Sequence, residues 1–228
     1  MTLVLFGLVS VYAATAFDLP PQLVTTHLLG EDLPAGLPPV PLADEFYALG
    51  WSPTGDFAYL ENQYETSDTR RLVFEIRDLV EDRPLELKSW IVPSRVPTHD
   101  WWDTHEAEIE ALMSAKQIRP EVQQLGEFPL ILGETYLQVS LLTHLNSSNT
   151  RWIDHINIVV HASSSGSKSV FNARGYWRWC TLLGFVPSPF ENRVALIVLI
   201  QPTGWNGVRE PLRYFIVGSS LTVGFSKP

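Results

Sequence analysis

The chain has 228 residues, of which 45% are apolar and 18% are charged, and its formal net charge is −9. This length and composition exclude a disordered chain and are typical of a globular protein with a sizeable core. The acidic balance also disfavours nucleic acids and anionic membrane surfaces as partners, because both require a basic binding surface.

Residues 1–16 have the features of a secretory signal peptide. They carry no charge, their apolar run extends from Leu3 to Val11, and they end in the small-residue triplet Ala14-Thr15-Ala16. The basic residues that usually precede such a run are missing, so a buried strand is the alternative interpretation. We expect removal of this segment, export to the periplasm or the medium, and no membrane span in the mature chain.

Proline is frequent in the next segment, residues 17–45, where it occupies positions 20, 21, 34, 38, 39 and 41. Because the proline ring fixes φ and removes the backbone N–H, we expect extended, irregular chain there. Residues 46–228 are expected to form a single β-rich domain.

The domain is expected to begin with a β-hairpin. The segments Phe46 to Trp51 and Phe57 to Glu61 flank Ser52-Pro53-Thr54-Gly55, in which a fixed φ followed by a permissive glycine favours a turn. A polar loop over Asn62 to Arg70 should follow. Two further strands are predicted, Arg71 to Leu79 and Leu85 to Val92.

The sequence predicts one helix, over Thr98 to Ile118. Thr98 or Asp100 can cap its N-terminus. Ile109 and Met113 recur at helical spacing, and Pro120 prevents continuation of the helix. We therefore expect an amphipathic helix that packs on a sheet.

The rest of the chain alternates between β-type segments and turn-like connectors. The predicted strands are Leu130 to Leu132, Tyr136 to Leu145, Trp152 to Ala162, Arg174 to Phe185, Arg193 to Gln201 and Leu212 to Val217. Val194 to Ile200 is continuously apolar, which indicates a central strand covered on both faces, and Ser163 to Ser169 is predicted to be a loop. The expected fold is mainly β, of the α+β class, with an antiparallel sheet or sandwich and one amphipathic helix.

Two parts of the sequence resemble known families. The segment Trp51 to Glu61 is similar to the strand-turn-strand unit of β-propeller blades in TolB-like proteins, but it occurs once, whereas a propeller repeats it. The order of this hairpin, the helix and the C-terminal sequence VALIVLIQPTGWNGVREPLRYFIVG resembles a family of predicted secreted bacterial proteins, domain of unknown function 2259. The resemblance is strong only at its two ends, and it implies secretion without any established activity or catalytic residue.

Aromatic side chains supply the first candidate binding surface. The chain has eight tryptophans. Period-two alternation predicts that Trp177 and Trp179 share one strand face, and Trp205 lies in a glycine-flanked turn. If exposed, these rings would form a stacking platform for sugars or a partner protein, and if buried they would belong to the core.

Histidines supply two further candidates. His155 and His161 share strand parity with Asn157, which predicts either a binding face or an ordinary polar outer face. At the helix start, His99 and His105 lie among carboxylates and could bind a metal ion, although their spacing matches no standard ligand pattern. A solvated helix end is the alternative interpretation of that cluster.

The chain contains no recognisable nucleophile elbow or phosphate-binding loop. Its single cysteine, Cys180, is expected to be a buried, unreactive thiol. We therefore predict an exported protein without a cofactor or metal site that binds a protein or glycan partner in the cell envelope. The candidate binding residues are Trp177, Trp179, Trp205, His155 and His161. The alternative is a metal-dependent or hydrolytic enzyme that uses His99 and His105.

Overall fold

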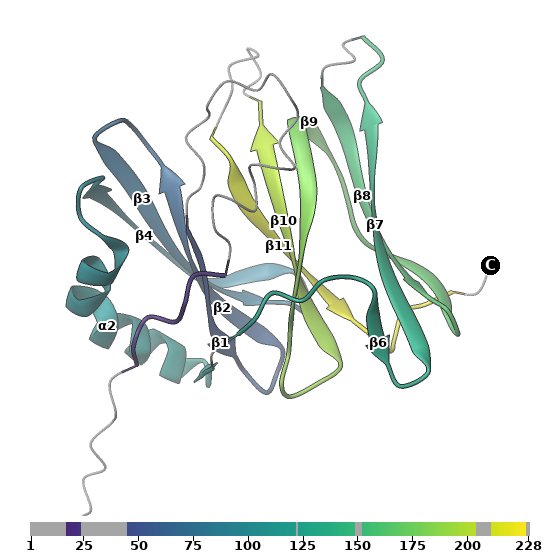
Figure 1. Cartoon of the computed structure of the whole chain (residues 1–228), viewed down its shortest axis with the longest axis horizontal. Helices are drawn as coiled ribbons and strands as arrows, with labels where there is room; N and C mark the ends of the chain where they lie inside the picture. Colours follow the sequence, from purple (N-terminus) through teal and green to yellow (C-terminus); the bar gives the residue numbers. More distant parts are fainter. Residues whose placement is uncertain (1–16, 24–44, 122, 149–151, 204–210, 227–228) are drawn as a thin grey trace, which may run out of the picture.

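The computed structural model describes residues 17–23, 45–121, 123–148, 152–203 and 211–226 (Figure 1). The expected signal peptide, residues 24–44 of the proline-rich segment, and Trp205 lie outside the described residues. Within them the fold is mainly β, with one helix and two antiparallel sheets, as the sequence predicts. No helix in this part of the chain is long and apolar enough to cross a membrane.

Sheet A is formed by the first half of the domain. Its order is β4-β3-β2-β1-β5, and its strands are β1 (Phe46–Trp51), β2 (Asp56–Tyr64), β3 (Thr69–Asp78), β4 (Arg83–Pro93) and β5 (Arg119–Pro120). The predicted hairpin joins β1 to β2, and the Ser52 hydroxyl accepts the Asp56 N–H at 2.9 Å to close the turn. The polar loop expected over Asn62 to Arg70 is shorter than predicted, because β2 and β3 continue their pairing to Tyr64 and Arg70.

Helix α2 (Thr98–Ala115) covers the outer face of sheet A (Figure 1). Trp102, Ile109 and Met113 are buried against the apolar side chains of this face. The predicted side-chain cap is wrong: Pro97 occupies the N-cap, and the Thr98 hydroxyl bonds to Glu45 and to Arg70 instead. The helix also ends three residues before the expected Ile118.

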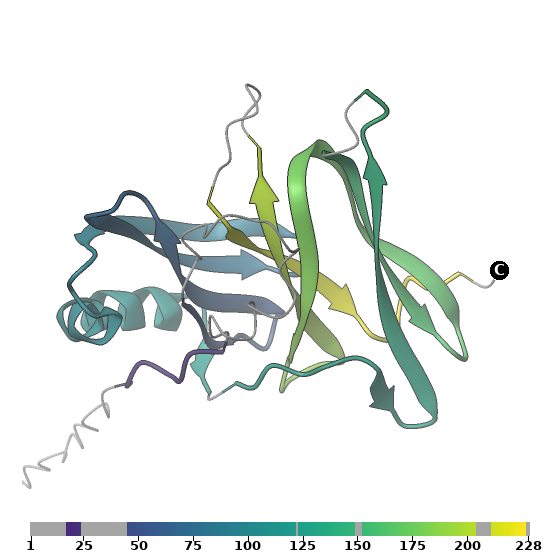
Figure 2. The same cartoon turned by 45° about the horizontal axis from the view of Figure 1, so that its top comes forward.

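Sheet B is formed by the second half of the domain. Its order is β11-β10-β9-β8-β7-β6, and its strands are β6 (Leu130–Leu132), β7 (Thr135–Leu145), β8 (Ile153–Ala162), β9 (Gly166–Pro187), β10 (Arg193–Pro202) and β11 (Arg213–Ser220). The serine-rich loop expected over Ser163 to Ser169 is reduced to a tight turn, because β9 already begins at Gly166. The long β9 bends, and the sheet curls into a half-barrel (Figure 2).

Sheet A therefore lies between α2 and the face of sheet B that is opposite its concave side. The core between the sheets combines residues of β1 and β2, such as Phe46 and Phe57, with residues of β10 and β11, such as Ile197 and Ile216. A second apolar cluster fills the concave side of sheet B. Strand β10 contributes to both clusters, so the predicted central strand is confirmed.

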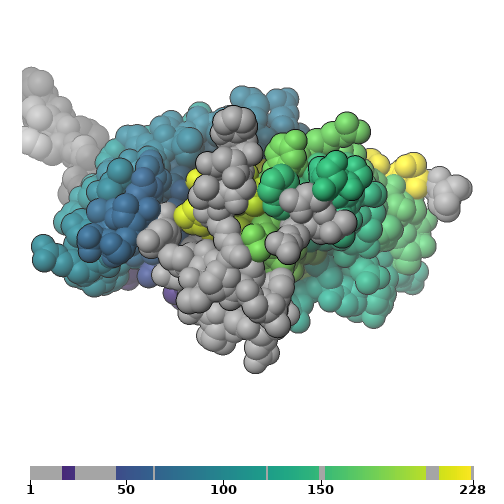
Figure 3. Space-filling view, turned by 90° about the horizontal axis from the view of Figure 1, so that it is seen from above, coloured from purple at the N-terminus to yellow at the C-terminus, as the bar shows by residue number. Residues whose placement is uncertain are grey.

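The domain is elongated along the direction that joins the two sheets. In the space-filling view from above, the blue strands of sheet A and the green and teal strands of sheet B occupy opposite ends (Figure 3). Yellow residues of the C-terminal strands lie between them. This arrangement leaves the outer face of β7–β9 at one end of the molecule, facing away from sheet A.

Candidate functional site

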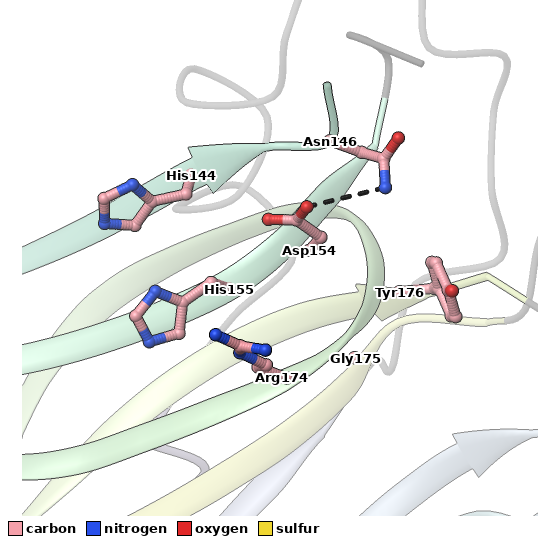
Figure 4. Close-up of a pocket in the computed structure, with 7 residues that line it drawn as sticks. All are labelled: His144, Asn146, Asp154, His155, Arg174, Gly175 and Tyr176. Carbon is pink, nitrogen blue, oxygen red and sulfur yellow. Dashed lines mark hydrogen bonds between the residues drawn. The ribbon is translucent and has the colours of Figure 1, made fainter. Parts of the chain in front are cut away.

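A polar basin of about 610 Å³ lies on the outer face of β7, β8 and β9. It is lined by His144, Asn146, Asp154, His155, Arg174, Gly175 and Tyr176. The two imidazoles and the Arg174 side chain form a row across the three strands, and Tyr176 stands on the other side of the hollow (Figure 4). Side chains from three neighbouring strands thus converge on one open hollow.

Irregular strand pairing creates the basin. In β8, Asp154 is an extra residue between Ile153 and His155 in the pairing with β7, and it stands opposite two residues of β9, Gly175 and Tyr176. Such β-bulges bend a strand and redirect its side chains. A Cβ atom on Gly175 would lie 2.6 Å from the ring of Trp177, so any larger residue there would require this ring to move.

The basin presents both donors and acceptors of hydrogen bonds. The rings of His144 and His155 stack with centroids 4.9 Å apart, and His155 Nε2 lies 2.8 Å from Asn172 Oδ1. Asn146 Nδ2 donates to Asp154 Oδ2 at 3.5 Å, which is a weak contact (Figure 4). The guanidinium of Arg174 is exposed beside these groups, so the basin combines a cation, a carboxylate and an aromatic ring.

The expected polar face of β8 is present, but only one end of it belongs to the basin. Ile156, Ile158 and Val160 are buried, whereas the residues between them in the strand point outward. His155 lies in the basin. His161 lies six positions further along the chain, where its Nε2 is 3.1 Å from the Ser140 hydroxyl and it does not line the hollow.

The tryptophans predicted to form a shared platform are separated by the sheet. Trp177 packs on the concave apolar cluster of sheet B, and Trp179 packs on the core between the sheets. The prediction of one shared face is wrong because the pairing of β9 with β10 skips Arg178, which reverses the alternation. Both side chains are half-buried.

The histidines at the start of α2 do not converge. His105 stacks on Trp101 with ring centroids 4.4 Å apart, while His99 is exposed and its Nε2 lies 4.0 Å from Asp103 Oδ1. Within the described ranges, no group of three potential metal ligands is found.

Sequence reasoning identified His155 but missed its neighbours in the basin. His144, Arg174 and Tyr176 come from three segments whose register cannot be read from a single strand pattern. One signal was available: Gly175 interrupts a predicted strand, and an isolated glycine there indicates a bulge or a close approach.

Comparison with known proteins assigns no family to the chain. No family model, no curated protein and no solved structure matches it. The similarity to domain of unknown function 2259 and to a single propeller hairpin therefore stays a prediction from the sequence.

Proposed function

We propose that this chain is an exported, non-enzymatic binding protein of the cell envelope that holds an acidic oligosaccharide in the basin on sheet B. The observation that carries this proposal is the convergence of Arg174, the His144–His155 pair and Tyr176 on a hollow of about 610 Å³. The predicted signal segment, residues 1–16, supports a periplasmic or secreted location.

The chemistry of the lining matches a sugar that carries a carboxylate. A guanidinium can bind a carboxylate with two parallel hydrogen bonds, and it does so better than a lysine would. The exposed ring of Tyr176 offers a rigid apolar face together with a hydroxyl. Asp154 and Asn146 supply oxygen and nitrogen atoms for sugar hydroxyls.

Titration calorimetry with two oligosaccharides of equal length tests the proposal. We expect a hexuronate trimer to bind with a dissociation constant of at most about 1 mM, and a neutral hexose trimer to bind at least about tenfold more weakly. Arg174→Gln should weaken binding of the hexuronate about 10- to 100-fold, because it removes a charge-assisted hydrogen bond worth about 1.5–3 kcal/mol.

The matched control uses two tyrosines of equal exposure. Tyr176 and Tyr136 are each 53% exposed, but only Tyr176 lines the basin. Tyr176→Ala should weaken binding, whereas Tyr136→Ala should leave the dissociation constant unchanged. Equal binding of the acidic and neutral trimers, or equal effects of the two tyrosine variants, would contradict the proposal.

A further inference from the structure

Strand β4 forms one edge of sheet A, and it is long for an edge strand. It has 11 residues, and among the described strands it pairs with β3 alone. Natural sheets usually keep their edge strands short or cover them, because the unpaired backbone groups of an edge can bind another chain. This margin of β4 belongs to sheet A, so it is separate from the basin on β7–β9 of sheet B.

The pairing of β4 with β3 determines which backbone groups of β4 point outward. Ser94 N–H donates to the Asp68 carbonyl at 2.8 Å, in continuation of the register between the two strands. In an antiparallel pair, residues that bond to the partner strand alternate with residues whose backbone groups point away from it. The N–H and C=O groups of Leu87, Ser89 and Ile91 therefore point away from β3. No hydrogen bond within the described ranges occupies these outward groups.

The side chains of the same residues are exposed. Leu87 is 59% exposed and Ile91 is 60% exposed, and they lie on one face of β4 with Ser89 between them. Lys88 is on the other face, where Glu108 of α2 binds its ammonium group, so this lysine is not directed at an incoming strand. Unpaired backbone groups beside exposed apolar side chains favour pairing with another strand.

A second copy of β4 matches this margin in one register. In a twofold arrangement every contact occurs twice, so antiparallel pairing centred on Ser89 places Leu87 of each copy opposite Ile91 of the other. All three outward residues then form hydrogen bonds, and the apolar side chains cover each other. Sliding one strand by two residues would instead place Ile91 opposite the irregularly paired Leu85, or Leu87 opposite Pro93, which has no N–H.

We propose that two copies of this chain associate through β4 in this register, so that their A sheets join into one continuous antiparallel sheet. Main-chain hydrogen bonds supply the affinity, and the two Leu87–Ile91 pairs fix the register. The interface is small, and each copy carries a net charge of −9. The dimer is therefore weak, and it tightens as salt screens the repulsion between the copies.

Sedimentation equilibrium of the full chain between about 5 and 500 µM, in about 150 mM sodium chloride, tests the proposal. We expect a dimer with a dissociation constant of at most about 100 µM. At this affinity the amides of Leu87, Ser89 and Ile91 should exchange hydrogen about threefold more slowly at the highest concentration than at the lowest. A chain that stays monomeric throughout would overturn the proposal and leave this margin to a different partner or to none.

Two exposed apolar residues give a matched pair of variants. Leu87 lies on the outward margin of β4, whereas Val80, which is 57% exposed, lies outside the strand. Leu87→Lys should weaken the dimer at least about tenfold, because it places a charge against Ile91 of the other copy. Val80→Lys makes the same change of net charge and should weaken it less than about twofold. Equal losses in the two variants would contradict an interface on β4.

A charge pair tests the register itself. Ile91→Glu alone should weaken the dimer at least about tenfold, as Leu87→Lys does. The double variant Leu87→Lys, Ile91→Glu places the introduced lysine of each copy opposite the introduced glutamate of the other, so its dissociation constant should return to within about threefold of the wild type. A double variant as weak as the single variants would overturn the register. None of these substitutions lies in the oligosaccharide site.

Discussion

At the scale of single residues, Glu61 is a buried side chain that forms a polar contact between the two sheets. It comes from β2 of sheet A and accepts the backbone N–H of Tyr214 in β11 of sheet B. Burial raises the pKa of Glu61 from 4.5 to about 7, and the hydrogen bond from Tyr214 opposes this shift. A folded chain therefore holds a proton on Glu61 at pH values where an unfolded chain releases it.

This difference predicts that stability falls as pH rises. The contribution of Glu61 is fully present below its unfolded pKa of 4.5 and is lost as pH rises through the folded pKa of about 7. The loss is roughly 3 kcal/mol, since each unit of pKa corresponds to about 1.4 kcal/mol. Glu61→Gln keeps an acceptor for the Tyr214 N–H but cannot ionise, so we expect it to remove most of this dependence. Urea unfolding at pH 4.5 and pH 8 measures the effect.

A second variant, compared with the wild type in the same way, isolates the contribution of Glu61 to the pH dependence of stability. Glu81→Gln removes a carboxylate whose side chain is 66% exposed, and it should leave the pH dependence close to that of the wild type. Parallel pH profiles for the wild type and Glu61→Gln would show that folding does not raise the pKa of Glu61.

At the scale of elements, alternation and apolar runs were enough to predict most strands. The predicted segments Arg193 to Gln201 and Leu212 to Val217 lie within or across β10 and β11, because long apolar stretches between turn residues leave few alternatives. The bulge at Arg178 was not predictable, because no glycine or proline marks it, and one extra residue reverses the face of everything that follows it. For this reason strict alternation predicts a common face for Trp177 and Trp179, whereas they lie on opposite faces.

The docking of α2 on sheet A predicts a large effect of one side chain. Ile109 is fully buried in the cluster that joins the helix to the sheet. Ile109→Ala should lower the free energy of unfolding by about 2–4 kcal/mol, because it removes buried methylene groups and leaves a cavity. Ile91→Ala makes the same chemical change at a residue that is 60% exposed, and it should cost less than about 0.5 kcal/mol. Similar losses in the two variants would contradict the observed packing of α2.

At the scale of the whole molecule, composition and strand count were sufficient for the fold class, but not for the candidate site. The fold class depends on local patterns that recur along the chain. The basin depends on which residues become neighbours: His144, His155 and Arg174 meet only because β7, β8 and β9 pair in one particular register. The contact between the sheets requires, in addition, the packing of β10 and β11 against sheet A, which no local pattern specifies.

The two sheets share one core, so the domain is expected to unfold as one unit. Residues of β1 and β2 interlock there with residues of β10 and β11. A substitution on the helix side of sheet A should therefore destabilise the far side of sheet B. Cys180 is a suitable reporter of sheet B, because it packs on the concave cluster, and burial raises the pKa of its thiol to about 11.

A brief pulse of iodoacetamide at pH 8, applied across a urea series, measures this coupling through the alkylation of Cys180. The folded thiol should react about 100-fold more slowly than an ordinary thiol on account of its pKa alone, so a pulse that fully alkylates unfolded chains leaves folded chains almost unlabelled. Ile109 lies on the opposite side of sheet A from Cys180, and a loss of about 3 kcal/mol in Ile109→Ala should lower the urea midpoint of alkylation by about 1 M. Ile91→Ala should leave the midpoint nearly unchanged. An unchanged midpoint in Ile109→Ala, despite a lower unfolding free energy of the helix, would mean that the sheets unfold independently and that their common core contributes little to the stability of either.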